Sequence, residues 1–196
     1  MSVVQKTADE EQCLEFIDSR LSKGRAAHCR RTFAKALELN DYYEVGLPRR
    51  SLALVTLLHD CAREAQPKEL AELLPPEEIQ SVPGGANNVG LLHGRAGAVL
   101  VEKELGIKDE EVLNAIAYHV TGHDEPSDLL TIQLISDLLE DGRPFRDYVP
   151  KPAEHRNVYS LCAAVLGCKL SHCLATSDLL LNDAVQAYNW YVRRAA

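Results

Sequence analysis

Apolar side chains recur along this chain at intervals of three and four residues, in short segments that begin and end with capping residues. Residues 9–22 show this pattern, with candidate buried positions at Cys13, Leu14, Phe16, Ile17 and Leu21. Such spacing places the apolar side chains on one face of an α-helix. No segment alternates convincingly between apolar and polar residues, which is the pattern of a half-buried strand. We therefore predict an all-α fold.

Helix start and stop signals divide the chain into roughly seven to nine helices, which we expect to form one bundle. Pro48 stands where the first turn of a helix tolerates proline, Asp109 is a candidate N-cap, and Gly106 and Gly122 are candidate helix ends. Besides residues 9–22, we expect helices at residues 24–43, 48–64, 67–75, 95–106, 110–120, 129–141, 154–170 and 177–194. Residues 81–94 are rich in glycine, asparagine and proline, and we expect a loop there.

The length of 196 residues suits a single domain. We expect one domain over residues 1–196, with its core at about residues 20–150 and a C-terminal helical extension at residues 151–196. The formal net charge of −8 disfavours nonspecific binding to nucleic acid or to an anionic membrane surface. No apolar stretch approaches the ~20 residues of a membrane span, and the N-terminal residues lack the apolar region of a signal peptide.

The six cysteines contain no CxxC pair and no spacing typical of a small disulfide scaffold. Reduced thiols in a cytoplasmic protein are the simplest interpretation of this pattern. Cys168, His172 and Cys173 lie close enough along the chain to suggest a zinc site, but a fourth ligand is not apparent.

An adjacent histidine and aspartate, His59 and Asp60, interrupt the apolar run LVTLLHDCAREA at residues 54–65. A carboxylate in such surroundings is costly unless a partner compensates its charge. A helix cap, a salt bridge or a metal ion would each do so. Asp137 raises the same question within IQLISDLLE, because it can face outward through a polar stripe or inward toward a cation.

Three further histidines, His28, His93 and His119, stand beside apolar or small residues in separate segments. Each taken alone is typical of an ordinary core or surface histidine. Together with the histidine–aspartate pair and the later aspartate, they follow the order H…HD…H…H…D. Neutral imidazoles and carboxylates supply nitrogen and oxygen ligands suited to iron, manganese, cobalt or zinc.

This order resembles the metal-binding signature of the HD-domain phosphohydrolases, an all-helical superfamily. The YqeK-type HD proteins, which are bacterial symmetrical hydrolases of diadenosine tetraphosphate, have successive blocks that resemble four segments of this chain: RAAHC, LLHDCARE, LLHGRAGAVLVEKELGIKDEEVLNAIAYHVTG and LISDLLEDGRPF. The resemblance runs from about residue 20 to residue 150, and DAVQAYNWY is similar to the family's tail.

The resemblance implies metal-dependent hydrolysis of a nucleotide phosphoanhydride, in which a hydroxide between two metals cleaves diadenosine tetraphosphate into two ADP. Two divalent or mixed-valence transition metal ions are implied, with iron expected. One metal would be held by His28, His59, Asp60 and Asp137, and Asp60 would bridge to a second metal held by His93 and His119. The implied catalytic residues are Asp60 and Arg63, and the implied substrate-binding residues are Arg25, Arg63, Thr121, Gly122 and Arg143.

Three positions depart from the family pattern. Arg63 replaces the family's usual lysine, Val120 replaces a polar residue, and SDLLEDGR lacks the family's proline. These changes retain the implied ligands but leave the preferred nucleotide open. An HD phosphohydrolase acting on a nucleoside monophosphate or a guanosine alarmone is one alternative, and a non-catalytic metal-binding regulatory or interaction protein is another. Whether the chain forms a homodimer is also left open.

Overall fold

The computed structural model describes residues 9–143, 150–176 and 178–195, which fold into ten α-helices and two 3-10 helices. These described residues contain no strand, so the predicted all-α class is confirmed. The α-helices are α1 (Glu10–Arg20), α2 (Lys23–Tyr42), α3 (Arg49–Leu58), α4 (Pro67–Leu73), α5 (Pro76–Gln80), α6 (Val89–Leu105), α7 (Glu110–Ala117), α8 (Asp128–Leu139), α9 (Val158–Thr176) and α10 (Asn182–Arg194). The 3-10 helices are η1 (Gly85–Asn87) and η3 (Pro152–Glu154).

Capping residues set several helix ends where the sequence predicts them. Asp9 forms a capping box with Gln12 at the start of α1. The Asp9 side chain accepts the backbone N–H of Gln12, and the Gln12 side chain accepts the backbone N–H of Asp9. The side chains of Ser22, Asp109 and Ser127 accept backbone N–H groups at the starts of α2, α7 and α8. Gly106 ends α6 with a φ of +65°, a conformation that glycine adopts without strain.

Several helix boundaries differ from the sequence prediction, among them the start of α10, at Asn182 instead of residue 177, and both ends of α9, at Val158 and Thr176 instead of residues 154 and 170. The side chain of Asn88 caps α6, so this helix begins at Val89 and includes His93, which the sequence composition places in a loop. The helices α3 and α7 end earlier than predicted, at Leu58 and Ala117. The short α5 was not predicted; it begins at Pro76, in the first turn where proline needs no N–H partner. The described helix count is therefore ten instead of seven to nine.

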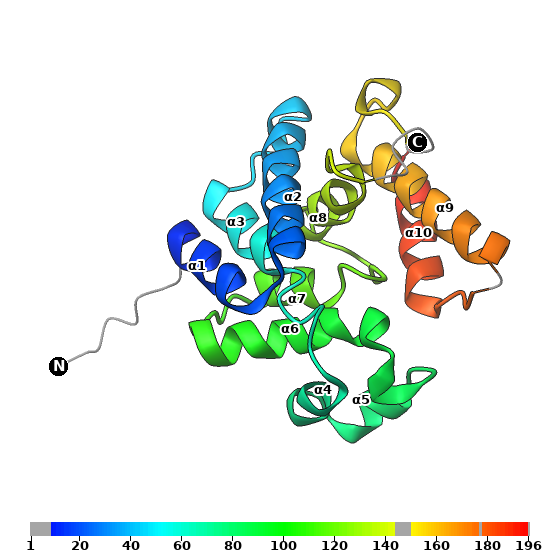
Figure 1. Cartoon of the computed structure of the whole chain (residues 1–196). Coiled ribbons are helices and arrows are strands. Elements are labelled where there is room, and N and C mark those ends of the chain that lie inside the picture. Colours follow the sequence, from blue (N-terminus) through cyan, green and yellow to red (C-terminus); the bar gives the residue numbers. More distant parts are fainter. Residues whose placement is uncertain (1–8, 144–149, 177, 196) are drawn as a thin grey trace.

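The centre of the bundle is α3, in which every residue from Leu52 to Leu58 is buried. This helix packs against α1, α2, α7 and α8 (Figure 1). An apolar run without a polar face predicts a helix surrounded on all sides, and the structure agrees. The C-terminal end of α3 is consequently directed into the interior of the protein.

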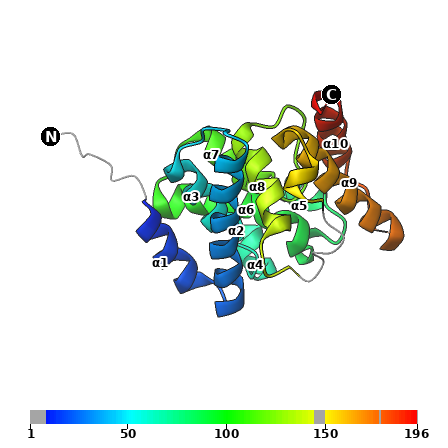
Figure 2. The same ribbon diagram turned by 90° about the horizontal axis from the view of Figure 1, so that it is seen from above.

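The last two helices, α9 and α10, pack against each other, and α9 also packs against α8. Both views show this pair on the side of the molecule opposite α1 (Figures 1 and 2). Among the described residues, α9 is the one helix long and apolar enough to cross a membrane by length and composition. The sequence analysis expects no apolar stretch that approaches the length of a membrane span, and α9 is an exception. Its packing on two other helices is that of a bundle helix.

Candidate metal centre and active-site cleft

His59 and Asp60 lie in the turn that follows α3, and both side chains are buried. The turn is closed by the backbone N–H of Arg63, which donates to the carbonyl of Asp60 at 2.8 Å. The Nδ1 atom of His59 lies 2.8 Å from the carbonyl oxygen of Thr56 in the preceding helical turn. The buried helix thus delivers an imidazole and a carboxylate into the bundle interior.

The carboxylate of Asp60 is shared by two groups of buried metal-ligand atoms. Its Oδ2 atom lies 3.6 Å from the Nε2 atoms of both His28 and His59. Its Oδ1 atom faces the other group, at 3.0 Å from Nε2 of His93 and 3.7 Å from Nε2 of His119. Each oxygen of one carboxylate therefore belongs to a different pair of histidines, which is the arrangement of a bridging ligand.

Asp137 reaches the first of these groups from the last turn of α8. Its Oδ1 atom lies 3.2 Å from Nε2 of His28 and 3.8 Å from Nε2 of His59. The side chain is buried and faces inward, so the alternative of an outward polar stripe does not apply. The structure thus brings together all the residues that the sequence predicts as metal ligands.

The imidazole rings are oriented as metal ligands require. The Nδ1 atoms of His93 and His119 lie 3.0 Å and 2.7 Å from the carbonyl oxygens of Val89 and Ile116. A neutral imidazole has a single N–H, and donating it to a carbonyl leaves Nε2 with an exposed lone pair. The Nε2 atoms of these two rings are only 3.0 Å apart, and those of His28 and His59 are 3.3 Å apart. Lone pairs converging so closely fit a divalent cation between them.

The ionisation of the cluster also suits a cation. Burial lowers the pKa of His59, His93 and His119, so these rings are neutral near pH 7 and able to coordinate. Burial opposes ionisation of Asp60 and Asp137. The guanidinium of Arg25 pairs with the Asp60 carboxylate, and His28, Lys169 and Arg143 hold the pKa of the Asp137 carboxyl well below its usual value. Neutral imidazoles and ionised carboxylates form a donor set of intermediate hardness, which suits a divalent transition metal.

Gly94 explains how the second pair of histidines can meet. A Cβ atom at this position would lie 2.6 Å from the carbonyl oxygen of Ala117 and 3.2 Å from Nδ1 of His119. The absence of a side chain therefore allows α6 to approach the end of α7 closely. The glycine that follows His93 in the sequence is a packing requirement of the metal centre.

A cavity of about 630 Å³ opens onto this cluster and is lined by several of the predicted substrate-binding residues. Arg25 lies in its wall and donates to Oδ2 of Asp60 at 2.8 Å. Arg143 also lines it, bonding the Asp137 carboxylate and donating to the Asp137 carbonyl at 3.0 Å. Arg63 lines it as well, close enough for its charge to lower the pKa of His93, and no hydrogen bond or ion pair joins its side chain to another described residue. This cavity is named the active-site cleft below.

Two predicted substrate-binding residues lie in the turn after α7. Thr121 lines the active-site cleft, and its hydroxyl donates to the carbonyl oxygen of Gly122 at 2.8 Å. Gly122 itself is outside the cleft lining. Its φ is +69°, and a Cβ atom there would lie 2.8 Å from the Cβ of Ala187 on α10. Gly122 therefore serves the turn and the packing of α10.

Sequence reasoning missed Lys169, which lines the active-site cleft with its Nζ atom 3.9 Å from Oδ2 of Asp137. The signal that could have identified it is a single charged residue within the apolar segment LCAAVLGCKLSHCL. Its neighbours Cys168, His172 and Cys173 also line the cleft, but they form no metal-ligand group with one another or with any other described residue. The described part of the chain contains two groups of three residues that could hold a metal ion, and both groups include Asp60.

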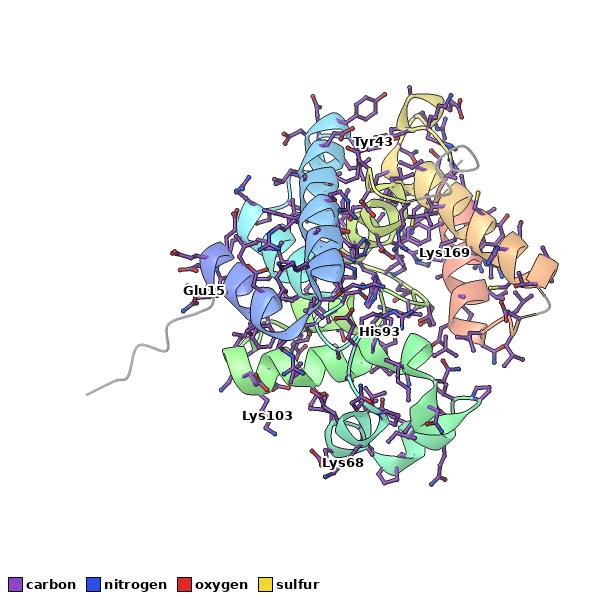
Figure 3. The ribbon with its side chains drawn as sticks, viewed as in Figure 1. Glu15, Tyr43, Lys68, His93, Lys103 and Lys169 are labelled. Carbon is purple, nitrogen blue, oxygen red and sulfur yellow. The ribbon has the colours of Figure 1, made fainter. Side chains whose placement is uncertain are left out.

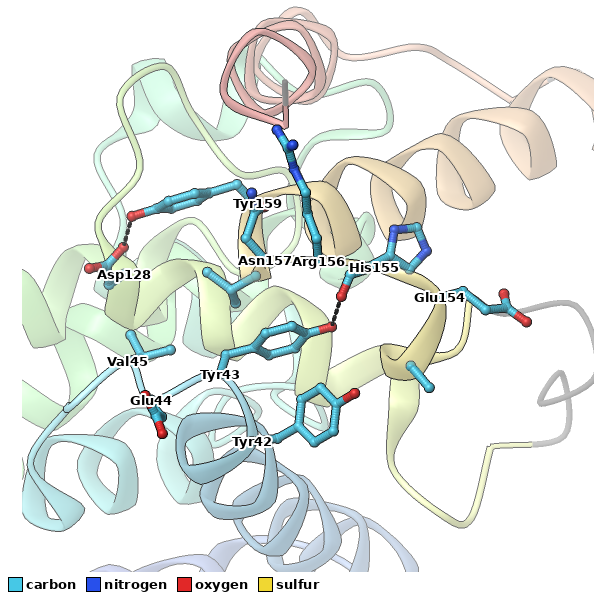
Figure 4. A pocket seen from close by; sticks show the side chains of 12 residues that line it. Tyr42, Tyr43, Glu44, Val45, Asp128, Glu154, His155, Arg156, Asn157 and Tyr159 are labelled. Atoms are coloured by element: carbon cyan, nitrogen blue, oxygen red, sulfur yellow. Dashed lines mark hydrogen bonds between the residues drawn. The ribbon is translucent and has the colours of Figure 1, made fainter.

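A second, larger cavity of about 780 Å³ lies between the end of α2 and the start of α9 (Figure 4). Two of its three tyrosines, Tyr43 and Tyr159, donate hydrogen bonds within the protein. The hydroxyl of Tyr43 donates to the carbonyl of Pro152 at 2.8 Å, and that of Tyr159 donates to Asp128 at 2.7 Å. Among the residues that the structure describes, no metal-ligand group faces this cavity, so the converging ligands locate the candidate active site in the smaller one.

Comparison with known proteins agrees with this geometry. Residues 25–158 match the HD domain family, so the chain belongs to that family. A solved structure from Clostridium acetobutylicum, described as a predicted HD superfamily hydrolase involved in NAD metabolism, superposes with a TM-score of 0.82. It is 26% identical in sequence, and the likeness covers 96% of this chain and 99% of that one.

Within the HD family, the chain is similar to proteins named symmetrical bis(5'-nucleosyl)-tetraphosphatase. The protein of that name from Bacillus subtilis is 25% identical over 94% of this chain and 98% of its own length. Those from Halalkalibacterium halodurans and Staphylococcus aureus are each 30% identical over 68% of this chain, covering 70% and 67% of their lengths. The resemblance drawn from the sequence blocks is thereby confirmed.

Proposed function

We propose that this chain hydrolyses diadenosine tetraphosphate symmetrically and releases two molecules of ADP. The observation that carries the proposal is the carboxylate of Asp60, whose two oxygens face separate pairs of buried histidines at the active-site cleft. The names of the relatives support the choice of substrate. The cleft volume of about 630 Å³ is within the range of small-molecule sites.

Two transition metal ions, iron in our proposal with manganese, cobalt or zinc as alternatives, fit the donor set. One would be held by His28, His59, Asp60 and Asp137, and the other by Asp60, His93 and His119. When bound, such ions supply Lewis acidity toward phosphoryl oxygens and activate water at neutral pH.

The remaining residues of the site act on the phosphate chain and on the carboxylates. Arg63 has no carboxylate partner among the described residues, so its guanidinium is available to bind a phosphate of the substrate. Arg25 and Arg143 hold Asp60 and Asp137 in place. Both also line the cleft, as Arg63 does, so three guanidinium groups come from residues of the same cavity wall.

The proposed reaction consumes one water molecule. The water oxygen forms a bond to one of the two inner phosphorus atoms, and the bond from that atom to the central bridging oxygen breaks. The bridging oxygen leaves on the second ADP, and the water oxygen remains on the first.

The substrate is small and soluble, and the six cysteines are free of disulfides, so we place the enzyme in the cytoplasm without a nucleic-acid or membrane partner.

Product analysis in oxygen-18 water tests this function. We expect ADP as the only nucleotide product, with the label in one of every two ADP molecules. AMP with ATP would show asymmetric cleavage and would contradict the proposal. Inertness toward dinucleotides, with turnover of a mononucleotide, would replace it with another HD phosphohydrolase activity.

A further inference from the structure

Lys169 brings a positive charge to the active-site cleft from outside the matched HD region. That region ends at residue 158, where α9 begins, and Lys169 lies near the middle of α9. Figure 3 shows Lys169 on the inner side of this helix, whereas Lys103 points away from α6. The C-terminal helices therefore do more than complete the bundle, because they add a basic side chain to the cleft.

The ammonium group of Lys169 is held loosely by Asp137. Its Nζ atom lies 3.9 Å from Oδ2, while Oδ1 of the same carboxylate faces His28 and Arg143. The Lys169 side chain is 27% exposed, and it is one of the residues that line the cleft. A lysine has a flexible stem and a compact charge, so its ammonium can move several ångströms at small cost.

We propose that Lys169 binds a phosphate of the nucleotide substrate, acting with Arg63 in the active-site cleft. This inference rests on the proposed function, in which Asp137 holds a cation. An ammonium group next to a carboxylate that holds a cation is repelled by that cation, and the cleft is the space into which it can turn. A phosphate chain there would supply the negative charge that Asp137 no longer offers. Lys169 then contacts substrate, and its removal weakens nucleotide binding without removing a metal ligand.

Three variants test the role of Lys169. Lys169→Met removes the charge while keeping an unbranched stem, and Lys169→Arg restores the charge. Lys103→Met is the matched control, because Lys103 is exposed on α6 and is not among the residues that line the cleft. The measurements are KM and kcat with diadenosine tetraphosphate, the Kd of ADP and of inorganic tripolyphosphate by calorimetry, and the metal content of each purified protein.

We expect Lys169→Met to raise the KM and both Kd values about tenfold, as expected for loss of one charge-assisted contact. Metal content and kcat should change little, Lys169→Arg should recover most of the affinity, and Lys103→Met should match the wild type. Unchanged Kd values in Lys169→Met would overturn the inference, as would a loss of metal that accounts for all of the weaker binding. If the wild type fails to cleave diadenosine tetraphosphate, the proposed function fails, while the tripolyphosphate Kd still decides the role of Lys169.

Discussion

Oε1 of Glu140 lies 3.2 Å from Nδ1 of His28, and both side chains are buried. Burial opposes the charge on Glu140, but hydrogen bonds from Arg31, from the backbone N–H of Gly142 and from His28 lower its pKa to about 2. Glu140 is therefore an ionised acceptor for the Nδ1–H of His28. It fixes the ring with Nε2 directed toward Asp60 and Asp137, and such supporting carboxylates raise the basicity of a ligating imidazole.

Glu140→Ala should weaken metal binding about 10- to 100-fold, because His28 would lose the partner that orients it. Competition with a chromogenic chelator measures this affinity. Glu38→Ala is a suitable control, since Glu38 pairs with Lys35 at the surface and its side chain is 62% exposed. Equal metal affinity in Glu140→Ala and the wild type would show that His28 needs no orientation by Glu140.

Gly94→Ala should destabilise the protein by about 1–3 kcal/mol, because the new methyl group would press on the backbone of α7. We also expect weaker metal binding at His93 and His119, which depend on this close approach. Urea unfolding and metal analysis check the two effects. Gly24→Ala is the control, because a Cβ atom at Gly24 meets nothing within 4 Å. If both variants behave alike, the close approach at Gly94 is unimportant.

Arg63→Ala should lower kcat/KM about 10- to 100-fold, the effect of losing a hydrogen bond between charged groups. Its metal content should stay at the wild-type level, because Arg63 contacts no predicted ligand through a hydrogen bond or ion pair. Arg63→Lys should keep most of the activity, since the charge is retained. Steady-state kinetics with metal analysis distinguishes these effects, and full activity of Arg63→Ala would exclude a role in binding phosphate.

The metal-free protein should lose stability as the pH falls below about 6.5. Burial lowers the pKa of His59, His93 and His119 from 6.5 in the folded state, so the unfolded chain binds protons first as the pH falls. At higher pH these rings are neutral in both states and contribute no pH dependence. Urea unfolding of chelator-treated protein between pH 8 and pH 5 measures the slope. A stability that is constant over this interval would show that the rings are not held neutral in the fold.

The helical class and the residues of the site could be predicted because both leave a local record in the sequence. Apolar spacing predicts each main helix, and the buried run before His59 predicts a helix that ends in the interior. The order of histidines and aspartates predicts which residues gather, and their roles as ligands stay predictions to be tested by metal analysis. Helix boundaries are harder to predict where a capping residue lies within a segment that has the composition of a loop. Asn88 is such a residue, because it starts α6 within a segment rich in glycine.

The contribution of Lys169 depends on tertiary packing and could not be predicted from periodicity. It reaches Asp137 only because α9 packs against α8, and nothing near Lys169 in the sequence specifies that partner. Gly122 shows the converse case. A family motif suggested a role with substrate, whereas its positive φ and its contact with α10 give it a role in the backbone turn.

The central claim is that one carboxylate, Asp60, serves two metal sites. Metal analysis of the wild type, Asp60→Ala and His93→Ala tests it most directly, with diadenosine tetraphosphate hydrolysis measured on the same samples. We predict two metal ions per chain in the wild type, a loss of both metals and of activity in Asp60→Ala, and a loss of one metal in His93→Ala. Asp60→Ala protein that retains full metal content and normal turnover would contradict the account.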